Sequence, residues 1–274
     1  MQTSYSMKQK TVFTQSKQLW WRHLENRIIL YYEKLDSTNT RVKELAKEGA
    51  QHGTVVVADK QTAGKGRRGR TWESPAGTNI YMSLLLRPEM EPSRAPMLTL
   101  VMAYSIAKAL RKRGYGDVQI KWPNDLILSG KKICGILTEM ELEGQEISHV
   151  VIGVGINANM RAFPEELQDK ATSLCLEGGK EVNREQLIAE ILEVFDEDYE
   201  RFLEKKDLAF LQDAYNRMLV NCNREVQVLE PGNEYTARAL GINKEGELLV
   251  QKADGSQEAV FAGEVSVRGI YGYV

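Results

Sequence analysis

The sequence predicts an α+β fold, in which helices pack on a mixed β-sheet and a small β-barrel follows. Apolar, β-branched runs alternate with helical patterns from residue 27 to about residue 221, which is typical of a sheet covered by helices. From residue 222 the pattern changes to short alternating runs separated by the turns PGN, NKEG and ADGS. We therefore expect a large domain over 27–221 and a barrel domain over 222–274, preceded by an arm without clear periodicity at 1–26.

The first elements are marked by β-branched runs and by a capping signal. Residues 27–35 (RIILYYEKL) are expected to form a strand. Asp36 or Ser37 then offers an N-cap for a short helix over 38–49, which Gly49 ends. Two further strands are expected at 54–62 and 79–88, the second stopping at a proline.

The middle of the large domain combines one buried helix with three more strands. Residues 97–113 are apolar on most sides and end in a basic tail, which favours a mostly buried helix with charges suited to its C-terminus. Polar turns with the sequences SGKK and EGQE separate the runs that follow. These runs predict strands at 119–128, 131–144 and 146–159.

Two helices close the large domain before the barrel begins. Residues 183–205 carry one apolar face, and Asn183 with Gln186 resembles a capping box. A second helix is expected at 207–219. The barrel should contain five short strands, at 224–230, 235–242, 246–252, 258–264 and 265–273.

Composition and charge limit the class of protein. The chain has 274 residues, 42% hydrophobic and 27% charged, which excludes a mainly disordered state. Its net charge of -2 gives no overall attraction to nucleic acid or to an acidic membrane, so any site for a polyanion must be local. No run approaches the roughly 20 apolar residues of a membrane-spanning helix. The three cysteines form no CxxC pair, so we expect a cytoplasmic protein without disulfides.

The most unusual stretch is 64–70 (GKGRRGR), with four cations and three glycines in seven residues. It satisfies G-x-G-x-x-G, but the following TWESPAGTN does not start the helix that a dinucleotide fingerprint requires, and no G-K-[ST] completes a Walker loop. The stretch is interpreted as a flexible cationic loop that closes over an anionic ligand. A solvated basic hairpin, or a patch for nonspecific nucleic-acid contact, is the alternative.

Three other clusters contain chemically useful side chains, each with an ordinary alternative. In 121–125 (KWPND) and 131–137 (KKICGIL) a lysine precedes a buried strand and can point into a cleft, although such lysines are usually on the surface. DSTN at 36–39 offers hydroxyl and amide groups, or plain helix capping. In 153–157 (GVGIN) the missing side chains indicate close approach of a ligand or of another backbone, or a bulge. The histidines show no metal spacing.

Taken together and in this order, these clusters closely resemble the biotin–protein ligases, the biotin–[acetyl-CoA-carboxylase] ligase family. The segments that carry the resemblance are DSTN at 36–39, QTAGKGRRGRTW at 61–72, KWPNDL at 121–126, GKKICGIL at 130–137 and GVGINAN at 153–159. It covers about residues 28–274 and implies a class II synthetase-like biotin–lipoate ligase domain followed by an SH3-like barrel. Lys65 stands where the family more often has arginine. The arm lacks a helix-turn-helix pattern, so the form without an N-terminal DNA-binding domain is expected.

The resemblance implies an enzyme that makes biotinyl-5'-AMP from biotin and ATP and passes biotin to a lysine of a biotin carboxyl carrier domain in a carboxylase. Because the biotin carboxylate and the α-phosphate are both anions, cations must neutralise them, and Mg²⁺ is expected to share that task. Lys132 is expected between the two anions, with Arg67 and Lys65 closing from the loop. Asp125 is expected to orient Lys132 or to assist the incoming lysine.

The resemblance also implies a binding site drawn from the whole large domain. The polar end of biotin should meet Ser37, Thr38 and Gln61. Trp72 should cover the adenine or the valeryl chain, and Asn157 should read the nucleotide. The full set expected to bind biotin and ATP is Ser37, Thr38, Asn39, Gln61, Lys65, Gly66, Arg67, Arg70, Trp72, Lys121, Asn124, Lys132, Gly135 and Asn157. Lys132, Arg67 and Asp125 are the expected catalytic residues, and no residue is assigned to a metal.

Two alternative functions remain open at this point. A lipoate–protein ligase has a related fold and the same adenylate logic, although the GKGRRGR loop favours biotin. A nucleic-acid-binding regulator would use the basic loop alone, but specific DNA binding is not expected from a slightly acidic chain. No membrane partner is expected, and the protein is expected to be a monomer or a homodimer. The cationic loop should act as a lid whose cations gain partners only when an anionic ligand is present.

Overall fold

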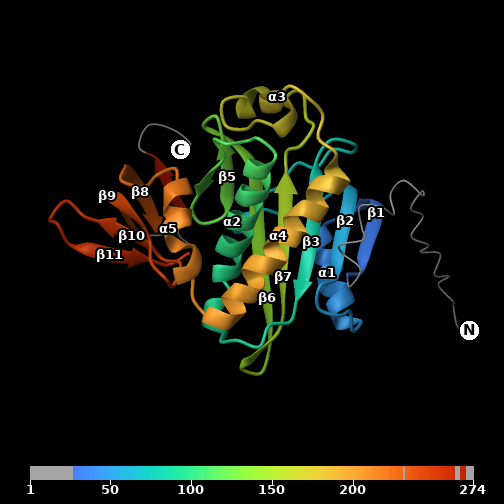
Figure 1. Ribbon diagram of the computed structural model, residues 1–274, viewed down its shortest axis with the longest axis horizontal. Coiled ribbons are helices and arrows are strands. Elements are labelled where there is room, and N and C mark those ends of the chain that lie inside the picture. Colours follow the sequence, from blue (N-terminus) through green and yellow to red (C-terminus); the bar gives the residue numbers. More distant parts are fainter. Residues whose placement is uncertain (1–26, 231, 263–265, 270–274) are drawn as a thin grey trace, which may run out of the picture.

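The computed structural model describes residues 27–230, 232–262 and 266–269, so the expected N-terminal arm at 1–26 lies outside the described residues. Two β-sheets stand side by side, with helices packed on the larger one (Figure 1). No helix in the described ranges is long and apolar enough to cross a membrane. The expected architecture, a mixed sheet with helices and a separate small all-β unit, is confirmed.

The larger sheet has seven strands in the order β1-β2-β3-β7-β6-β5-β4. Only β1 and β2 are parallel to each other, and the other neighbouring pairs are antiparallel, which makes the sheet mixed as expected. Its strands are β1 (Ile29–Leu35), β2 (Val55–Gln61), β3 (Ile80–Leu86), β4 (Gln119–Lys121), β5 (Asp125–Leu128), β6 (Lys131–Glu143) and β7 (Glu146–Ile156).

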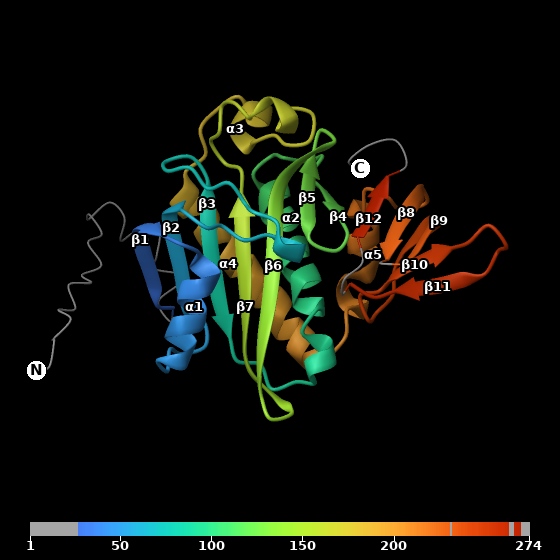
Figure 2. The same cartoon turned by 180° about the vertical axis from the view of Figure 1, so that it is seen from behind.

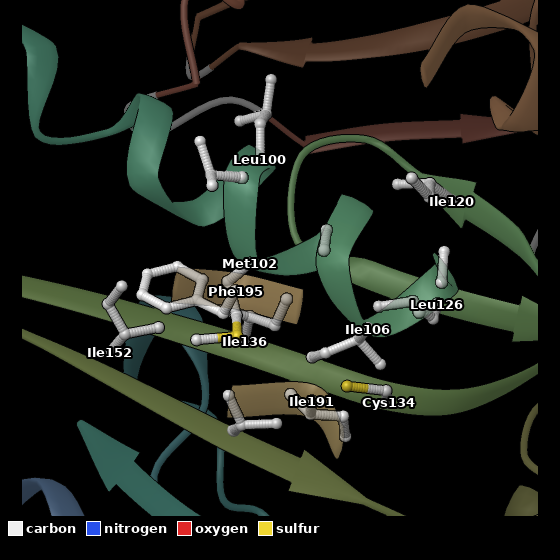
Figure 3. Packing of buried hydrophobic residues seen from close by; sticks show 14 of the residues in the cluster. Leu100, Met102, Ile106, Ile120, Leu126, Cys134, Ile136, Ile152, Ile191 and Phe195 are labelled. Carbon is white, nitrogen blue, oxygen red and sulfur yellow. The ribbon is translucent and has the colours of Figure 1, made fainter. Parts of the chain in front are cut away.

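One face of this sheet is covered by α2 (Met97–Lys112) and α4 (Arg184–Lys205), which lie across it (Figure 1). The long apolar run of α2 is buried on most sides because it packs on β4, β5 and β6 and also against the neighbouring α4. Figure 3 shows the resulting core, in which side chains of α2, α4 and the central strands interdigitate. Asn183 caps α4 as expected, since its side-chain oxygen accepts a hydrogen bond from the backbone N–H of Gln186 at 3.0 Å.

The opposite face is only partly covered by a helix. There α1 (Thr38–Lys47) packs on β2, β3 and β7. The segment between β2 and β3 runs across β7 and β6 toward the second sheet (Figure 2). It contains a single 3-10 turn, η2 (Arg67–Gly69). This face, between the start of α1 and the crossing segment, is where the predicted functional residues lie.

The second sheet has five antiparallel strands in the order β11-β10-β9-β8-β12. It follows α5 (Ala209–Met218) and joins the body through contacts such as the hydrogen bond from Trp122 Nε1 to the Gly246 carbonyl at 3.0 Å. The expected barrel strands are present, and within the described ranges they form one sheet with β11 and β12 at its edges. Their bounds are β8 (Glu225–Glu230), β9 (Asn233–Ile242), β10 (Leu248–Gln251), β11 (Gln257–Val260) and β12 (Ser266–Gly269).

One local prediction was wrong, and several short elements were not predicted. Residues 119–128 are not one strand but the hairpin of β4 and β5, with residues 122–124 as its turn. Pro123 and Asn124 each suited a turn better than a strand, but the apolar residues on both sides masked this signal. A short helix, α3 (Leu174–Gly178), was not predicted. It begins after Ser173, whose hydroxyl accepts a hydrogen bond from the N–H of Leu176 at 3.2 Å. The 3-10 turns η3 (Pro92–Arg94) and η4 (Glu165–Leu167) were also unpredicted.

Candidate active site

The floor of the site is a patch of the sheet that carries almost no side chains. In the pairing register, Gly155 of β7 lies beside Gly135 of β6, and Gly153 lies opposite Ser83 of β3. A Cβ on Gly155 would lie 2.7 Å from Nε1 of Trp72, and one on Gly153 would lie 2.0 Å from Oδ1 of Asn39. The sequence predicted that a ligand or another backbone approaches these glycines. In the structure the approaching groups are protein side chains, for which only glycine leaves room.

Hydroxyl and amide groups line one end of this floor, at the start of α1. Ser37, Thr38 and Asn39 are all nearly fully buried, with 2%, 4% and 4% of their surface exposed. Ser37 occupies the N-cap position, but its side chain makes no capping hydrogen bond, so simple capping does not explain this hydroxyl. Instead Gln61 of β2 accepts a hydrogen bond from the Thr38 N–H at 2.8 Å. The DSTN segment therefore directs its side chains toward the cleft and the sheet rather than toward the helix end.

The cationic loop forms a wall of the site. Its two arms pair at an isolated bridge between Lys65 and Thr71, and the 3-10 turn η2 lies between them. Gly64 is required here because a Cβ would lie 2.3 Å from the Trp72 carbonyl oxygen. The indole Nε1 of Trp72 is buried against Gly155 and has no hydrogen-bond partner among the described residues.

The cations of the loop have hydrogen-bond partners within the protein. This corrects the expectation that they gain partners only when an anionic ligand is present. Arg67 donates to Oδ1 of Asn124 at 3.0 Å and to the carbonyl of Ala262 at 2.8 Å. Lys65 donates to the Thr40 hydroxyl at 2.9 Å. Burial lowers the pKa of Arg67, an effect that the charge of nearby Asp125 partly offsets. All three acceptors are neutral, so a phosphate or carboxylate would be a stronger partner for each cation.

Lys132 and Asp125 form the charged centre of the site. Lys132 lies near the start of β6 and Asp125 begins β5, and their ammonium and carboxylate groups are 2.6 Å apart. The ammonium also lies 5.1 Å from the centre of the Trp72 ring, within the range of a cation–π contact. The predicted orientation of Lys132 by Asp125 therefore has a geometric basis. The predicted assistance to an incoming lysine stays a prediction.

Arg70, Lys121 and Asn157, which are also expected to bind biotin and ATP, differ in how freely their side chains could contact a ligand. Arg70 and Lys121 line the same cavity as Lys132, although only 7% of the Lys121 surface is exposed. Asn157 also lines it, but its amide nitrogen donates to the Thr172 carbonyl at 3.1 Å. The predicted reading of the nucleotide by Asn157 must therefore use its side-chain oxygen or follow a rearrangement.

These residues surround two adjoining cavities that share Trp72, Asn124 and Lys132. We call the first the floor cleft. Of the residues predicted from the sequence, it is lined by Ser37, Thr38, Asn39, Gln61, Lys65, Gly66, Arg67, Trp72, Asn124, Lys132 and Gly135. The second, the cation cleft, is larger and adds Arg70, Lys121, Asp125 and Asn157. The structure therefore brings every predicted site residue together.

Several residues of the site were missed from the sequence. Ser83 is fully buried in β3 and lies within hydrogen-bond distance of both Thr38 and Asn39. Glu139 of β6 accepts a hydrogen bond from Asn39, and Ser74 accepts one from Gln61. The signal for Ser83 was available, because it is the only small polar side chain in the apolar run 80–86. Glu139 and Ser74 stand in polar surroundings in the sequence, and nothing there distinguishes them.

The arrangement can hold an acid against a nucleotide. Neutral hydrogen-bonding groups lie at one end of the floor cleft, while Lys132 and Arg67 lie where it meets the cation cleft. Such a gradient suits a molecule with a neutral polar head and a carboxylate tail, placed next to a phosphate. Among the described residues no group of three or more histidine, cysteine or acidic side chains is arranged to hold a metal ion.

Fold and site together define a member of the class described as the biotin/lipoate A/B protein ligase family, whose model matches residues 31–157. The model of the biotin protein ligase C terminal domain matches residues 222–268. The bifunctional ligase/repressor BirA of Bacillus subtilis is 38% identical over 231 residues, 83% of this chain and 70% of that protein. The BirA of Escherichia coli is 33% identical over 264 residues, 96% of this chain and 81% of that protein. The chain therefore belongs to the biotin protein ligase family.

A solved structure supports the same assignment. The biotin protein ligase from Aquifex aeolicus, in complex with biotin and ATP, has a TM-score of 0.77 with this chain at 30% sequence identity. The match covers 88% of this chain and 99% of that one, so both sheets are included. This family assignment favours a biotin ligase over the two alternatives considered from the sequence.

Proposed function

We propose that this chain is a biotin–protein ligase that converts biotin and ATP to biotinyl-5'-AMP and pyrophosphate, and then transfers biotin to a specific lysine of a carrier domain. The observation that carries the proposal is the position of Lys132. Its ammonium lies 2.6 Å from Asp125 at the junction of the floor cleft and the cation cleft, where a carboxylate tail and an α-phosphate would meet.

In the first step a carboxylate oxygen of biotin attacks the α-phosphorus, and the bond from that phosphorus to the pyrophosphate oxygen breaks. Two anions approach each other, so the barrier falls when fixed cations offset the repulsion that develops. Lys132 and Arg67 supply these cations from two different elements. Because the reaction needs no enzyme nucleophile, the protein contributes position and charge rather than a covalent intermediate.

In the second step the neutral amine of the acceptor lysine attacks the acyl carbon, and AMP leaves with the electron pair of the broken C–O bond. The amine loses a proton in this step. Asp125 is the carboxylate of the cation cleft nearest to Lys132, and we assign it as the group that receives that proton when Lys132 turns toward the ligand.

Magnesium enters this scheme with the nucleotide substrate. Mg²⁺ commonly binds substrate phosphates and only one or two protein carboxylates. The described residues fit that mode, because the Asp125 carboxylate lies beside the expected phosphate position. The metal would add positive charge at the phosphates, and the Lys132 and Arg67 cations act beside it.

The proposed partner is a biotin carboxyl carrier domain of a biotin-dependent carboxylase, and the proposed location is the cytoplasm. Support for the partner comes from relatives such as the biotin–[acetyl-CoA-carboxylase] ligase of Paracoccus denitrificans, 40% identical over 126 residues, 45% of this chain and 52% of that protein. Support for the location comes from the free thiols of Cys134, Cys175 and Cys222.

The test is to incubate the protein with ATP, Mg²⁺ and either biotin or lipoate, together with a biotin carboxyl carrier domain or a lipoyl domain, and to weigh the carriers by mass spectrometry. The proposal expects the mass of one biotinyl group on the carrier domain, formed only when ATP and biotin are both present. Lipoyl transfer at a higher rate than biotinyl transfer would contradict it and would favour the lipoate alternative.

A further inference from the structure

A third cavity meets the two clefts at a single pair of residues. It lies beside them, between β6, the N-terminal end of α2 and the segment after β11, and its walls include Thr138, Met140 and Phe261. Among the described residues that line these three spaces, Arg67 and Asn124 alone belong to all of them. The floor cleft, the cation cleft and the third cavity therefore adjoin at these two side chains.

The two residues are hydrogen-bonded to each other in a direction that their chemistry fixes. The Arg67 guanidinium donates to Oδ1 of Asn124 at 3.0 Å, and a guanidinium can only donate. The amide nitrogen of Asn124 donates to the Ile136 carbonyl at 3.0 Å, and a carbonyl can only accept. The amide of Asn124 is therefore held from both ends with its oxygen toward Arg67.

The backbone of Asn124 is fixed to the large sheet as well. Its carbonyl accepts a hydrogen bond from the Ile136 N–H at 2.9 Å, so Asn124 exchanges two hydrogen bonds with one residue of β6. Ile136 is itself buried, with 2% of its surface exposed. Turning the Asn124 amide would break its bond to this buried strand, so Asn124 offers Arg67 an acceptor in one fixed place.

Arg67, in contrast, belongs to the cationic loop and has a long side chain that loses conformational entropy when it is held. A second acceptor, the carbonyl of Ala262, holds the guanidinium at 2.8 Å. The guanidinium is thus fixed between the turn that joins β4 to β5 and the segment that follows β11. It lies across the place where the three cavities meet.

This geometry gives Asn124 a different role from the ligand contact expected from the sequence, because both polar groups of its side chain have protein partners. We propose that Asn124 is a positioning residue that holds Arg67 as a partition between the bound adenylate and the third cavity. The inference rests on the proposed function and deepens it, because the reactive acyl carbon would lie where the floor cleft meets the cation cleft. Without the Asn124 acceptor, the guanidinium can swing about its contact with Ala262, and amines from solution gain access to that carbon.

The test measures how well the protein shields biotinyl-5'-AMP that has been made chemically. Protein in excess over this adenylate is mixed with hydroxylamine. The hydroxylamine nitrogen attacks the acyl carbon and loses a proton to solvent, while the C–O bond to the phosphate breaks and AMP leaves with the electron pair. The products are biotinyl hydroxamate and AMP, and the rate at which AMP appears reports loss of shielding by access or by release.

A double-mutant cycle shows whether Asn124 acts through Arg67. We expect AMP to appear roughly 3- to 10-fold faster in Asn124→Ala than in wild type, and roughly 10- to 100-fold faster in Arg67→Ala. The double variant should match Arg67→Ala within twofold, because the two effects share one contact and cannot add. Asn183→Ala is the matched control, since it removes a hydrogen bond to the Gln186 N–H outside all three cavities and should keep the wild-type rate.

The outcomes separate this inference from the proposed function. If Asn124→Ala keeps the wild-type rate, or accelerates AMP release as much in the Arg67→Ala background as in wild type, the positioning role is overturned. A structural role alone would lower the melting temperature, as in Asn183→Ala, without raising the rate. Should Asn124→Ala fail to fold, Asn124→Ser decides, because its hydroxyl keeps a polar group in the turn but is too short to reach Arg67.

The proposed function has its own point of failure in the same experiment. If the chain shields biotinyl-5'-AMP with the expected pattern of rates but releases no pyrophosphate from ATP and biotin, the proposed reaction fails and the partition stands. If the wild-type chain does not bind biotinyl-5'-AMP, the proposed function fails and the partition falls with it.

Discussion

The ammonium group of Lys132 is held in place by two contacts, one with a carboxylate and one with an aromatic ring. The Asp125 carboxylate lies 2.6 Å away, and the Trp72 ring lies on another side at 5.1 Å from the ammonium. Both contacts fix the direction of a long side chain before any ligand is bound, so less conformational entropy is lost when the carboxylate and the phosphate arrive. Its backbone is fixed too, since its N–H donates to the Lys170 carbonyl at 2.8 Å.

Lys132→Ala should therefore remove adenylate formation far more than it weakens biotin binding. The charge is needed most where the two anions meet, and loss of one such group typically costs on the order of 10²–10³ in rate. Single-turnover release of pyrophosphate, measured beside biotin affinity by calorimetry, checks this. Lys131→Ala is the matched control, because that ammonium donates to the Gln168 carbonyl outside both clefts. Release within threefold of wild type would refute the assignment.

The sequence identified the residues that line the two clefts but not the buried residues that contact those lining residues. DSTN, the cationic loop and KWPND are dense local clusters, so their chemistry is visible in a short window. Ser83 and Glu139 act on Asn39 from positions 44 and 100 residues away in the chain. No local pattern records a contact of that span, and only the register of β3, β7 and β6 brings the three together.

The cationic loop is the element that links the two sheets at the site. Arg67 joins it to Asn124 in the turn between β4 and β5, and to the Ala262 carbonyl after β11. The Arg67 guanidinium thus contacts the turn between β4 and β5 and the segment that follows β11 at the same time. Removing it should loosen the wall of both clefts while leaving the floor in place.

Arg67→Gly should let the reactive adenylate escape into solution, where it labels lysines of unrelated proteins. A charge-assisted contact is worth about 1.5–3 kcal/mol, so loss of bound adenylate should rise roughly 10- to 100-fold if release follows affinity. The measurement is biotin on a bystander protein at matched rates of adenylate synthesis. Arg68→Gly is the control, since the backbone φ of 57° at that residue suits glycine. Equal bystander labelling by wild type and Arg67→Gly would show that Arg67 does not retain the adenylate.

Most elements could be predicted because period and boundary signals agreed. The strand expected at 27–35 is β1 (Ile29–Leu35), and the helix expected at 97–113 is α2 (Met97–Lys112). The hairpin of β4 and β5 was harder, because three-residue and four-residue strands are too short to show a period. Sheet order was not predictable from the chain, since β7 lies between β3 and β6 although it follows β6 in sequence.

For the whole molecule, charge predicts that the chain does not bind a specific DNA sequence. Its net charge is -2, and two of its cations, Lys132 and Arg67, are turned into the clefts. We expect no footprint on DNA at physiological salt, with or without biotin and ATP, because phosphate contacts supply most nonspecific affinity and weaken steeply with salt. A salt titration of gel shifts measures this. A sequence-specific footprint that persists at physiological salt would contradict it.

Two histidines are expected to make the stability of the whole fold depend on pH. His52 precedes β2, accepts a hydrogen bond from the Arg87 N–H at 3.0 Å and stacks on Tyr199 of α4 with ring centres 5.8 Å apart. Burial lowers its pKa, and the charge of Arg27 adds to the effect. Burial also lowers the pKa of His149, against the opposing influence of Glu141. Both rings therefore favour the neutral form in the folded protein.

This direction of shift fixes the sign of the pH dependence. A histidine with a folded-state pKa below its unfolded value, near 6.5, binds more protons when the chain unfolds, so stability is lost as pH falls below about 6.5. In His52→Gln the midpoint of urea unfolding should fall less between pH 7 and pH 5 than in wild type, since glutamine can accept from Arg87 but does not titrate. Gln51→Asn, at the exposed neighbouring position, should keep the wild-type slope. Parallel curves for wild type and His52→Gln would show that His52 titrates alike in both states and would remove this source of acid sensitivity.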